Sequence, residues 1–313
     1  VFFSEGSNYW STFKPVLDVL NEKGIYYQYL TADNLDPALE QKEYSALYIG
    51  EMDKAFFFLN SMTARMCVMT TPQLNVLKLK RSKLVKHYCY LAHAPMDVHA
   101  NKLFSFDYFD SVLCGNDYHI ENLRFLEKIR GTKSKVIEKV GCTYYDNISE
   151  EKLLHSPSSI LIAPTWGDRT FLKHLGIPLI ESLLKKNYEV ILRPHPQSWI
   201  SDKELLNSII TLFGSDQHFS VDLNDSNIPS LQNAKLIICD VTSGIIYDFA
   251  LLYERPVIGI EQNWDQKGYE AYYLSTESCA KQFLRHYGAI INESTLESLP
   301  SKIESLTNSE IDS

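Results

Sequence analysis

The sequence predicts an α/β protein made of two Rossmann-like domains that face a cleft. Apolar, strand-like runs alternate with helical patterns along most of the 313 residues, which is typical of parallel sheets covered by helices on both faces. The alternation lapses once, in the charged and small residues of 147–159, so we expect a domain boundary there. Domains of 1–150 and 151–313 are each long enough to bury a core.

In the first domain, seven short apolar runs are expected to be strands: residues 1–4, 25–30, 46–50, 66–70, 87–92, 111–115 and 136–140. The apolar spacing of residues 9–23 predicts a helix that Gly24 ends. A second helix is expected over 117–130.

The second domain repeats this alternation. Strands are expected at 160–163, 188–192, 219–223, 236–239 and 257–260, and helices at 171–186, 202–213, 243–253 and 272–287. The polar tail from Glu293 predicts a last helix with a frayed end.

Composition narrows the possible partners. Hydrophobic residues make up 45% of the chain and charged residues 22%, as in globular proteins. The net charge of −9 argues against nucleic acid as a partner, so an anion site has to be a local concentration of positive charge. No apolar run approaches the roughly 20 residues needed to cross a bilayer. We expect no signal peptide, and a chain that opens on a strand without Met suggests missing upstream residues.

The six cysteines are scattered and form no Cys-x-x-Cys pair, so we expect buried free thiols in a reducing compartment. No Asp-x-Asp cluster lies in a suitable strand context. We therefore expect neither a metal nor another cofactor.

The sequence Arg-Pro-His-Pro follows the strand predicted at 188–192. Pro194 and Pro196 stop the strand and hold Arg193 and His195 in a rigid turn. Ligands of open α/β sheets bind outside the carboxyl ends of the strands. The pair is therefore suited to an anion such as a diphosphate. The alternative is a proline turn with a capping arginine and a solvent-facing histidine.

Another strand ends at Asp240, and a helix is expected just after Thr242 and Ser243, which are good N-caps. The N-terminus of a helix binds phosphate readily, and Gly244 would let a ligand approach the backbone. A capped helix with no ligand explains the same residues.

Two further strand ends carry candidates. After 160–163, we expect the backbone of Thr165 and Gly167 to contact a ligand, and Trp166 to pack. In the first domain, His93 directly follows the strand at 87–92, where a catalytic base would project into the cleft. His99 is a weaker alternative, and a structural role for His93 remains open.

Five stretches now stand in order in the second half of the chain: Ala-Pro-Thr-Trp at 163–166, Arg-Pro-His-Pro at 193–196, Asp-Val-Thr-Ser-Gly at 240–244, Tyr-Asp-Phe-Ala at 247–250 and Arg-Pro-Val-Ile at 255–258. This series resembles the CDP-glycerol glycerophosphotransferase family, the teichoic-acid polymerases and primases of GT-B fold. The resemblance covers residues 160–260, and His93-Ala94 stands where the family has a His-Gly pair.

The resemblance implies transfer of a polyol phosphate from a CDP-activated donor to a hydroxyl of a lipid-linked or polysaccharide acceptor, with release of CMP. The first domain would be the acceptor side and the second the nucleotide-donor side, at the inner face of the cell membrane with peripheral contact. His93 would be the base, and His195 would act on the donor diphosphate. The donor would also be bound by Arg193, Asp240, Thr242 and Ser243.

Two other functions stay open. After Ile258 the chain reads Gly-Ile-Glu-Gln-Asn-Trp, which departs from the Tyr- and Asp-rich run associated with the polymerases. A GT-B nucleotide-sugar enzyme, either a glycosyltransferase or a UDP-sugar 2-epimerase, would use Glu261 to hold a ribose or sugar hydroxyl. The third possibility is a non-catalytic binding module of a larger polymer-synthesis protein.

Overall fold

The computed structural model describes residues 1–147, 157–224 and 227–308. Most of the expected boundary at 147–159, and the expected frayed end at 309–313, lie outside the described residues. The chain forms two compact units, Val1–Glu151 with Gln266–Thr276, and Lys152–Asp265 with Glu277–Ser313. Residues 266–276 thus belong to the first unit, whereas the sequence placed them with the second domain.

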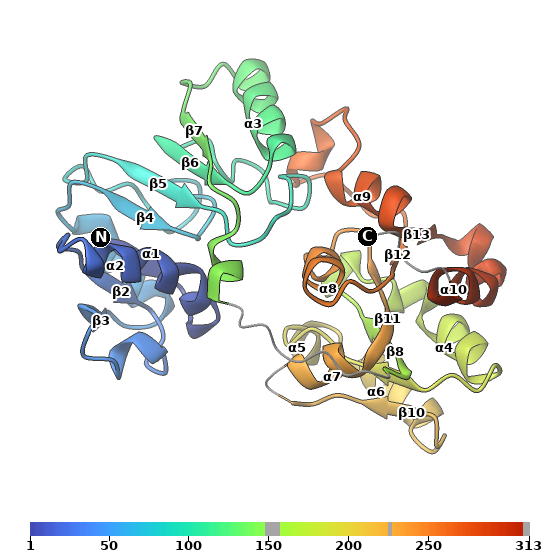
Figure 1. The fold of residues 1–313 in the computed structure, drawn as a ribbon. Helices are drawn as coiled ribbons and strands as arrows, with labels where there is room; N and C mark the ends of the chain where they lie inside the picture. Colours follow the sequence, from blue (N-terminus) through green and yellow to red (C-terminus); the bar gives the residue numbers. More distant parts are fainter. Residues whose placement is uncertain (148–156, 225–226, 309–313) are drawn as a thin grey trace. The chain divides into compact units, whose positions relative to one another are not determined.

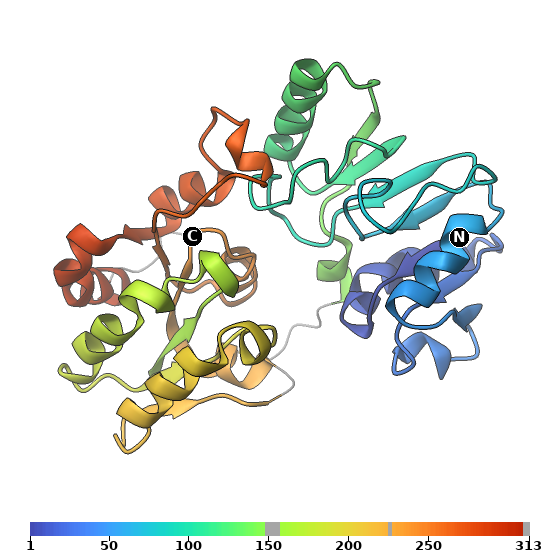
Figure 2. The same ribbon diagram turned by 180° about the vertical axis from the view of Figure 1, so that it is seen from behind.

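The first unit is a seven-stranded parallel sheet with strand order β3-β2-β1-β4-β5-β6-β7. Its strands and α-helices, in chain order, are β1 (Phe2–Ser4), α1 (Trp10–Glu22), β2 (Tyr29–Thr31), β3 (Ala46–Tyr48), α2 (Met52–Ser61), β4 (Cys67–Met69), β5 (Tyr88–Leu91), β6 (Ser111–Cys114), α3 (Asp117–Arg130) and β7 (Val136–Lys139). Figures 1 and 2 show helices on both faces of this sheet.

Successive side chains of a strand point to opposite faces of the sheet. In the first unit, both faces are covered, so neighbouring residues of one strand pack in two different cores. In β1, Phe2 packs with Phe13 of α1 on one face. Its neighbour Phe3 packs on the other face with the cluster that includes Leu59 of α2 and Leu123 of α3. The continuous apolar strands of the sequence therefore indicate a sheet covered on both sides.

The second unit is a six-stranded parallel sheet with strand order β10-β9-β8-β11-β12-β13. Its strands and helices are β8 (Ser159–Ala163), the π-helix η5 (Leu172–Gly176), α4 (Ile177–Leu184), β9 (Val190–Leu192), α5 (Ser198–Ser201), α6 (Lys203–Phe213), β10 (Phe219–Val221), α7 (Ile228–Asn233), β11 (Ala234–Asp240), α8 (Ile245–Tyr253), β12 (Val257–Ile260), α9 (Cys279–Tyr287), β13 (Gly288–Ile291), the short 3₁₀ helix η7 (Glu293–Ser298) and α10 (Leu299–Asn308).

One main core holds the second unit together. Ile160 and Ile162 of β8 and Ile238 of β11 pack in it with Leu179 of α4 and Ile303 of α10. Helix α8 packs on β11 and β12. The predicted fold class, α/β with two Rossmann-like domains, is confirmed by these two parallel sheets and their helices.

Several predicted boundaries were wrong. The strand expected at 25–30 begins only at Tyr29, and residues 25–28 are not paired with a neighbouring strand. The helix expected at 272–287 begins only at Cys279, because residues 266–276 pack in the first unit instead. Helices α2 and α7 and strand β13 were not predicted.

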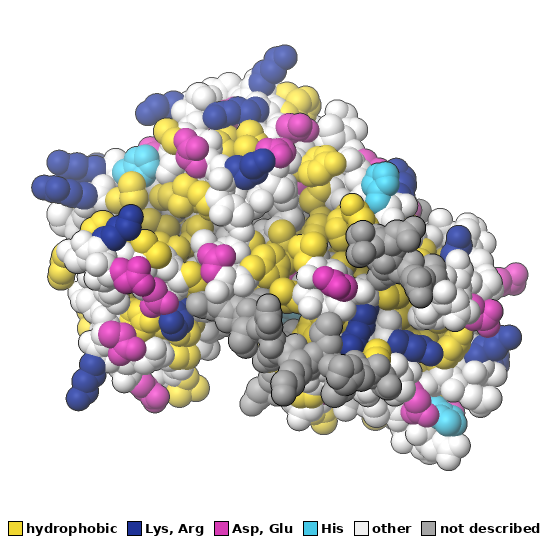
Figure 3. Space-filling view, in the orientation of Figure 1, with side chains coloured by type: hydrophobic (Ala, Val, Ile, Leu, Met, Phe, Trp, Pro, Cys, Tyr) yellow, Lys and Arg dark blue, Asp and Glu magenta, His cyan; other side chains and the backbone are white. Residues whose placement is uncertain are grey.

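Two properties of the surface bear on partners. In the part of the chain that the structure describes, no helix is both long and apolar enough to cross a membrane. On the face drawn in Figure 3, Lys and Arg side chains are scattered among acidic ones and do not form one patch. Positive charge offered to a ligand on that face therefore comes from individual residues.

Candidate functional site

Three of the expected motifs lie at one edge of the second sheet. Strands β9, β8 and β11 are parallel neighbours, with Leu192 paired to Ile162 and Ala163 paired to Cys239 near their carboxyl ends. The loops that follow the three strands therefore emerge side by side. After β8, the chain continues to β9 on one side of it, and β11 is added on the other side. The strand order therefore reverses at β8, and open α/β sheets bind ligands at such a switch point.

Asp240, at the end of β11, ties this edge together. Its carboxylate is 1% exposed, and its two oxygens accept hydrogen bonds from the backbone N–H groups of Thr165 (2.7 Å) and Phe171 (2.8 Å). Burial raises the pKa of Asp240 to about 7, although the two N–H donors and the nearby Arg169 act in the opposite direction. We expected Asp240 to bind the donor; in the structure, both of its carboxylate oxygens accept hydrogen bonds from the loop after β8.

The expected backbone contacts of this loop also change. The Thr165 N–H is taken by Asp240, and the Gly167 N–H donates to the carboxylate of Asp202 at 2.9 Å. Both groups were expected to contact a ligand, and both are used within the protein. Gly167 has a φ of +69°, a conformation that favours glycine, so its presence follows from the turn. Trp166 is 38% exposed and lies at the surface of the loop rather than in a core.

Arg193, after β9, is ion-paired with Asp222 at 2.5 Å. The Asp222 carboxylate also accepts hydrogen bonds from the Ser230 hydroxyl and from Asn224. We expected Arg193 to face an anionic ligand, but Asp222 balances its charge. The pair holds the turn after β9 in place.

His195 lies at the surface with a defined orientation. Its Nδ1 accepts a hydrogen bond from the Gln197 N–H at 3.1 Å, so Nε2 carries the proton of the neutral ring. Partial burial and the positive charge of Arg169 lower the pKa of His195. The centroids of the His195 and Trp166 rings are 6.1 Å apart, so the loops after β8 and β9 lie side by side at this point. His195 can thus donate a hydrogen bond to an anion at this edge.

The start of α8 differs from the expected capped helix. The N-cap is Gly244, without a side-chain cap, so Thr242 and Ser243 do not cap the helix as predicted. Among the described residues, the buried Thr242 hydroxyl oxygen has no hydrogen-bond partner. Buried polar groups without a partner are rare in folded proteins. A ligand oxygen at the helix N-terminus would satisfy this hydroxyl and gain from the helix dipole.

Two charged residues at this edge were missed by the sequence analysis. Arg169 is near enough to both His195 and Asp240 to affect their pKa values, and it follows Gly167 by only two residues. Asp248 lies in the first turn of α8, where burial raises its pKa to about 7. Arg169 follows the quoted motif at 163–166, and Asp248 is part of the quoted motif at 247–250, so a charged residue near each motif was the available signal.

The first unit carries a separate set of buried polar atoms. His93 follows β5 and Thr70 and Thr71 follow the adjacent β4, so all three lie at the carboxyl edge of the sheet. The His93 Nδ1 and the Thr70 hydroxyl oxygen are buried and have no hydrogen-bond partner among the described residues, whereas the Thr71 hydroxyl interacts with the carboxyl group of Glu5. Burial lowers the pKa of His93 to about 4, and its ring lies edge-on to Tyr9 at 5.0 Å. His93 is therefore neutral at pH 7.

His99, the weaker alternative, has partners for its ring. Its Nδ1 is 3.0 Å from Asp97, and its Nε2 is 2.8 Å from the backbone oxygen of Thr276. These contacts give His99 a structural role. Across residues 1–147, 157–224 and 227–308, no group of three or more His, Cys, Asp or Glu side chains could hold a metal ion.

No protein-family model matches the chain, and no curated protein matches it. Solved structures do share its fold. The UDP-GlcNAc 2-epimerase of Methanocaldococcus jannaschii, in complex with UDP-GlcNAc and UDP, has a TM-score of 0.65 at 13% identity and matches 99% of this chain and 92% of its own. S. aureus MnaA with UDP has a TM-score of 0.62 at 11% identity, with 98% and 88% covered. Anabaena HepE with UDP and glucose has a TM-score of 0.55 at 13% identity, with 98% and 89% covered. The chain therefore has the GT-B fold.

Proposed function

We propose that the protein is an enzyme that acts on a nucleoside-diphosphate-activated sugar, either as a glycosyltransferase or as a sugar 2-epimerase. The observation that carries the proposal is the edge formed by β9, β8 and β11. There, the uncapped start of α8 and the unpartnered Thr242 hydroxyl follow β11, and the proton-bearing Nε2 of His195 follows β9, with β8 between these two parallel strands. These donors suit a diphosphate. The likeness to proteins solved with UDP supports uracil as the base of the nucleotide.

In the glycosyltransferase reaction, the bond between the sugar carbon and the diphosphate oxygen breaks as the bond to the acceptor oxygen forms, and its electron pair leaves with the nucleoside diphosphate. Negative charge grows on that leaving oxygen. The Nε2–H of His195, the positive charge of Arg169 and the dipole of α8 would stabilise it without reorganising. Asp240 and Arg193 would act indirectly, by positioning the loops after β8 and β9.

In a transferase, the first unit would bind the acceptor, and His93 would be the base. A neutral imidazole can accept a proton, and burial keeps His93 neutral at pH 7; the same lowering of its pKa to about 4 makes it a weaker base than a free imidazole. The acceptor oxygen would attack the sugar carbon while its proton moves to His93. Thr70 and Thr71 supply hydroxyls beside this position.

The second candidate is transfer of a polyol phosphate from a CDP-activated donor. It is favoured by the ordered motifs, because Arg-Pro-His-Pro and Asp-Val-Thr-Ser-Gly follow strands of one sheet edge. Here the acceptor oxygen would attack phosphorus, and CMP would leave. A lipid-linked or polysaccharide acceptor would place this reaction at the inner face of the cell membrane.

Thermal unfolding with millimolar UDP, UDP-sugars, CDP, CDP-glycerol, UMP and CMP tests the proposal. A ligand present at 100 times its Kd adds roughly 2.7 kcal/mol of stability, which a melting curve resolves. We expect UDP compounds to stabilise the protein, and His195→Ala or Thr242→Val to weaken this effect by about tenfold in affinity.

His286→Ala is the matched control, because His286 is an exposed histidine of α9 that precedes the amino end of β13 and does not lie at the carboxyl ends of the strands. Stabilisation by cytidine compounds alone would favour the polyol-phosphate reaction, and CMP release would then be assayed. Binding without turnover of any donor would indicate a binding module. No shift with any nucleotide would contradict both enzyme proposals.

A further inference from the structure

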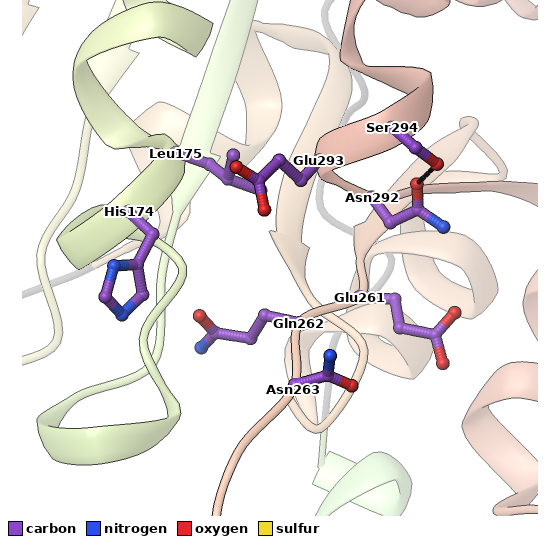
Figure 4. A pocket seen from close by; sticks show the side chains of 8 residues that line it. All are labelled: His174, Leu175, Glu261, Gln262, Asn263, Asn292, Glu293 and Ser294. Atoms are coloured by element: carbon purple, nitrogen blue, oxygen red, sulfur yellow. Dashed lines mark hydrogen bonds between the residues drawn. The ribbon is translucent and has the colours of Figure 1, made fainter.

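The second unit contains a pocket of about 790 Å³, apart from the residues assigned above to the diphosphate. It is formed by three segments far apart in the sequence: the π-helix η5, the chain after β12 and the chain after β13. Figure 4 shows its lining residues, which are His174, Leu175, Glu261, Gln262, Asn263, Asn292, Glu293 and Ser294. We propose that this pocket binds an uncharged polyhydroxyl group, such as a neutral sugar ring, and rejects sugars that carry an anionic group.

The chemistry of the lining selects this class of ligand. Ligand pockets are usually lined mainly by apolar side chains, whereas here only Leu175 is apolar. Carboxylates and amides accept and donate the hydrogen bonds that sugar hydroxyls need. Glu261 and Glu293 are among the lining residues, which include no Lys or Arg. Glu261 is ion-paired with Lys281, so the uncompensated negative charge is that of the Glu293 carboxylate. A phosphate or carboxylate on the ligand would therefore be repelled.

Part of the lining is already held in place. Glu261 is ion-paired with Lys281, and the Gln262 side-chain amide donates to the Arg169 backbone oxygen at 2.5 Å. The Asn292 side-chain oxygen accepts hydrogen bonds from the Ser294 hydroxyl at 2.7 Å, drawn in Figure 4, and from the Thr295 N–H at 3.2 Å. Such contacts fix the polar groups before a ligand arrives.

Other lining groups remain for a ligand. Within the described part of the chain, the side chains of His174, Asn263 and Glu293 form no hydrogen bond or ion pair with the protein. They come from the three segments, so a ring bound between them would be held from several sides. His174 and Leu175 lie on a π-helix, a rare conformation that occurs often at functional sites.

The pocket is connected to the edge described above through the bond between Gln262 and Arg169. The inference deepens the proposed function, because it specifies that the sugar of the activated donor is neutral. The statement that the pocket holds the sugar of the donor rests on the proposed function. The binding of a neutral sugar by the pocket itself rests on the lining residues alone.

Saturation-transfer NMR on the full chain tests the proposal with free glucose, N-acetylglucosamine and glucuronate, and with UDP in parallel. We expect the two neutral sugars to bind and glucuronate to bind at least about tenfold more weakly. Glu293→Gln and Asn263→Ala should each weaken the neutral sugars by about tenfold and leave UDP affinity unchanged.

Glu297→Gln is the matched control, since Glu297 is exposed on the same short helix, η7, but does not line the pocket. Equal binding of glucuronate and glucose, or neutral-sugar binding unaffected by both pocket variants, would overturn the inference. Sugar binding that depends on the pocket without any binding of nucleotides would instead contradict the proposed function and leave the inference standing.

Discussion

At the scale of single residues, Asp240 is a motif residue whose carboxylate is used within the protein. Its two oxygens hold the Thr165 and Phe171 N–H groups, and these bonds shape the loop that carries Trp166 and Arg169. A polar strand-end residue suggested direct binding. Under the proposed function, Asp240 would act on the ligand through the loop that its hydrogen bonds hold.

Asp240→Asn should therefore destabilise the second unit and weaken nucleotide binding. Asparagine replaces one acceptor oxygen by an NH₂ group that faces a backbone N–H, and leaving such a buried donor unsatisfied costs about 1–3 kcal/mol. Urea unfolding measures the loss of stability, and a UDP titration measures the affinity. Asp168→Asn is the control, because Asp168 belongs to the same loop but is exposed. Unchanged stability in Asp240→Asn would show that the hydrogen bonds of Asp240 to Thr165 and Phe171 do not stabilise the second unit.

His119 makes the stability of the first unit depend on pH. It is 3% exposed, neither ring nitrogen has a hydrogen-bond partner among the described residues, and burial lowers its pKa to about 4. The unfolded chain, with a histidine pKa of about 6.5, binds the proton more readily. Stability is therefore full above about pH 6.5 and falls as the pH drops toward 4.

We expect His119→Leu to reduce this loss, by up to about 1.4 kcal/mol per pH unit within that window. Melting curves of the variant and the parent between pH 4 and 7 provide the comparison. His286→Leu, at an exposed histidine, should keep the parental slope. A slope unchanged in His119→Leu would assign the pH dependence to other groups.

At the scale of elements, residues 266–276 belong to the first unit, although the residues before and after them in the sequence belong to the second unit. Its Leu103–Gly268 and Glu270–Asn101 backbone hydrogen bonds are 2.9 and 2.8 Å long. Glu270 is fully buried, accepts a hydrogen bond from the Ser105 N–H and is ion-paired with Arg130. The buried pair attaches the segment to α3.

Glu270→Ala should destabilise the first unit by about 3–5 kcal/mol, because it leaves Arg130 with less compensation for its burial. The value should lie toward the lower end, since Asp107 still contacts Arg130 at 2.7 Å. Chemical unfolding measures the change, and Glu121→Ala, at an exposed position of α3, is the control. A loss no larger than that of the control would show that the segment is held by its backbone hydrogen bonds.

At the scale of the whole molecule, the six cysteines confirm the prediction of buried free thiols. Burial raises the pKa of Cys67 to about 12 and that of Cys114 to about 11, so these thiols resist forming the reactive thiolate. We expect a thiol reagent to modify none of the six rapidly in the folded protein and all six after unfolding. Rapid modification of the native protein would indicate that one unit opens readily.

The sequence by itself determined the fold class and the location of the candidate site at the carboxyl ends of β9, β8 and β11. Apolar runs of strand length, alternating with helices, are local features, and parallel strands bring their carboxyl ends to one edge whatever the details of packing. The motifs after β8, β9 and β11 were therefore found before their contacts were known, as was His93 after β5.

Only the tertiary structure decided which polar groups are used internally and which are left for a ligand. Arg193 meets Asp222 from another strand, and Asp240 meets the loop of residues 165–171, so the partners lie 29 to 75 residues apart. The proposed sugar pocket likewise combines segments near residues 174, 262 and 293. Contacts over such separations depend on packing and register, which no local pattern of residues specifies.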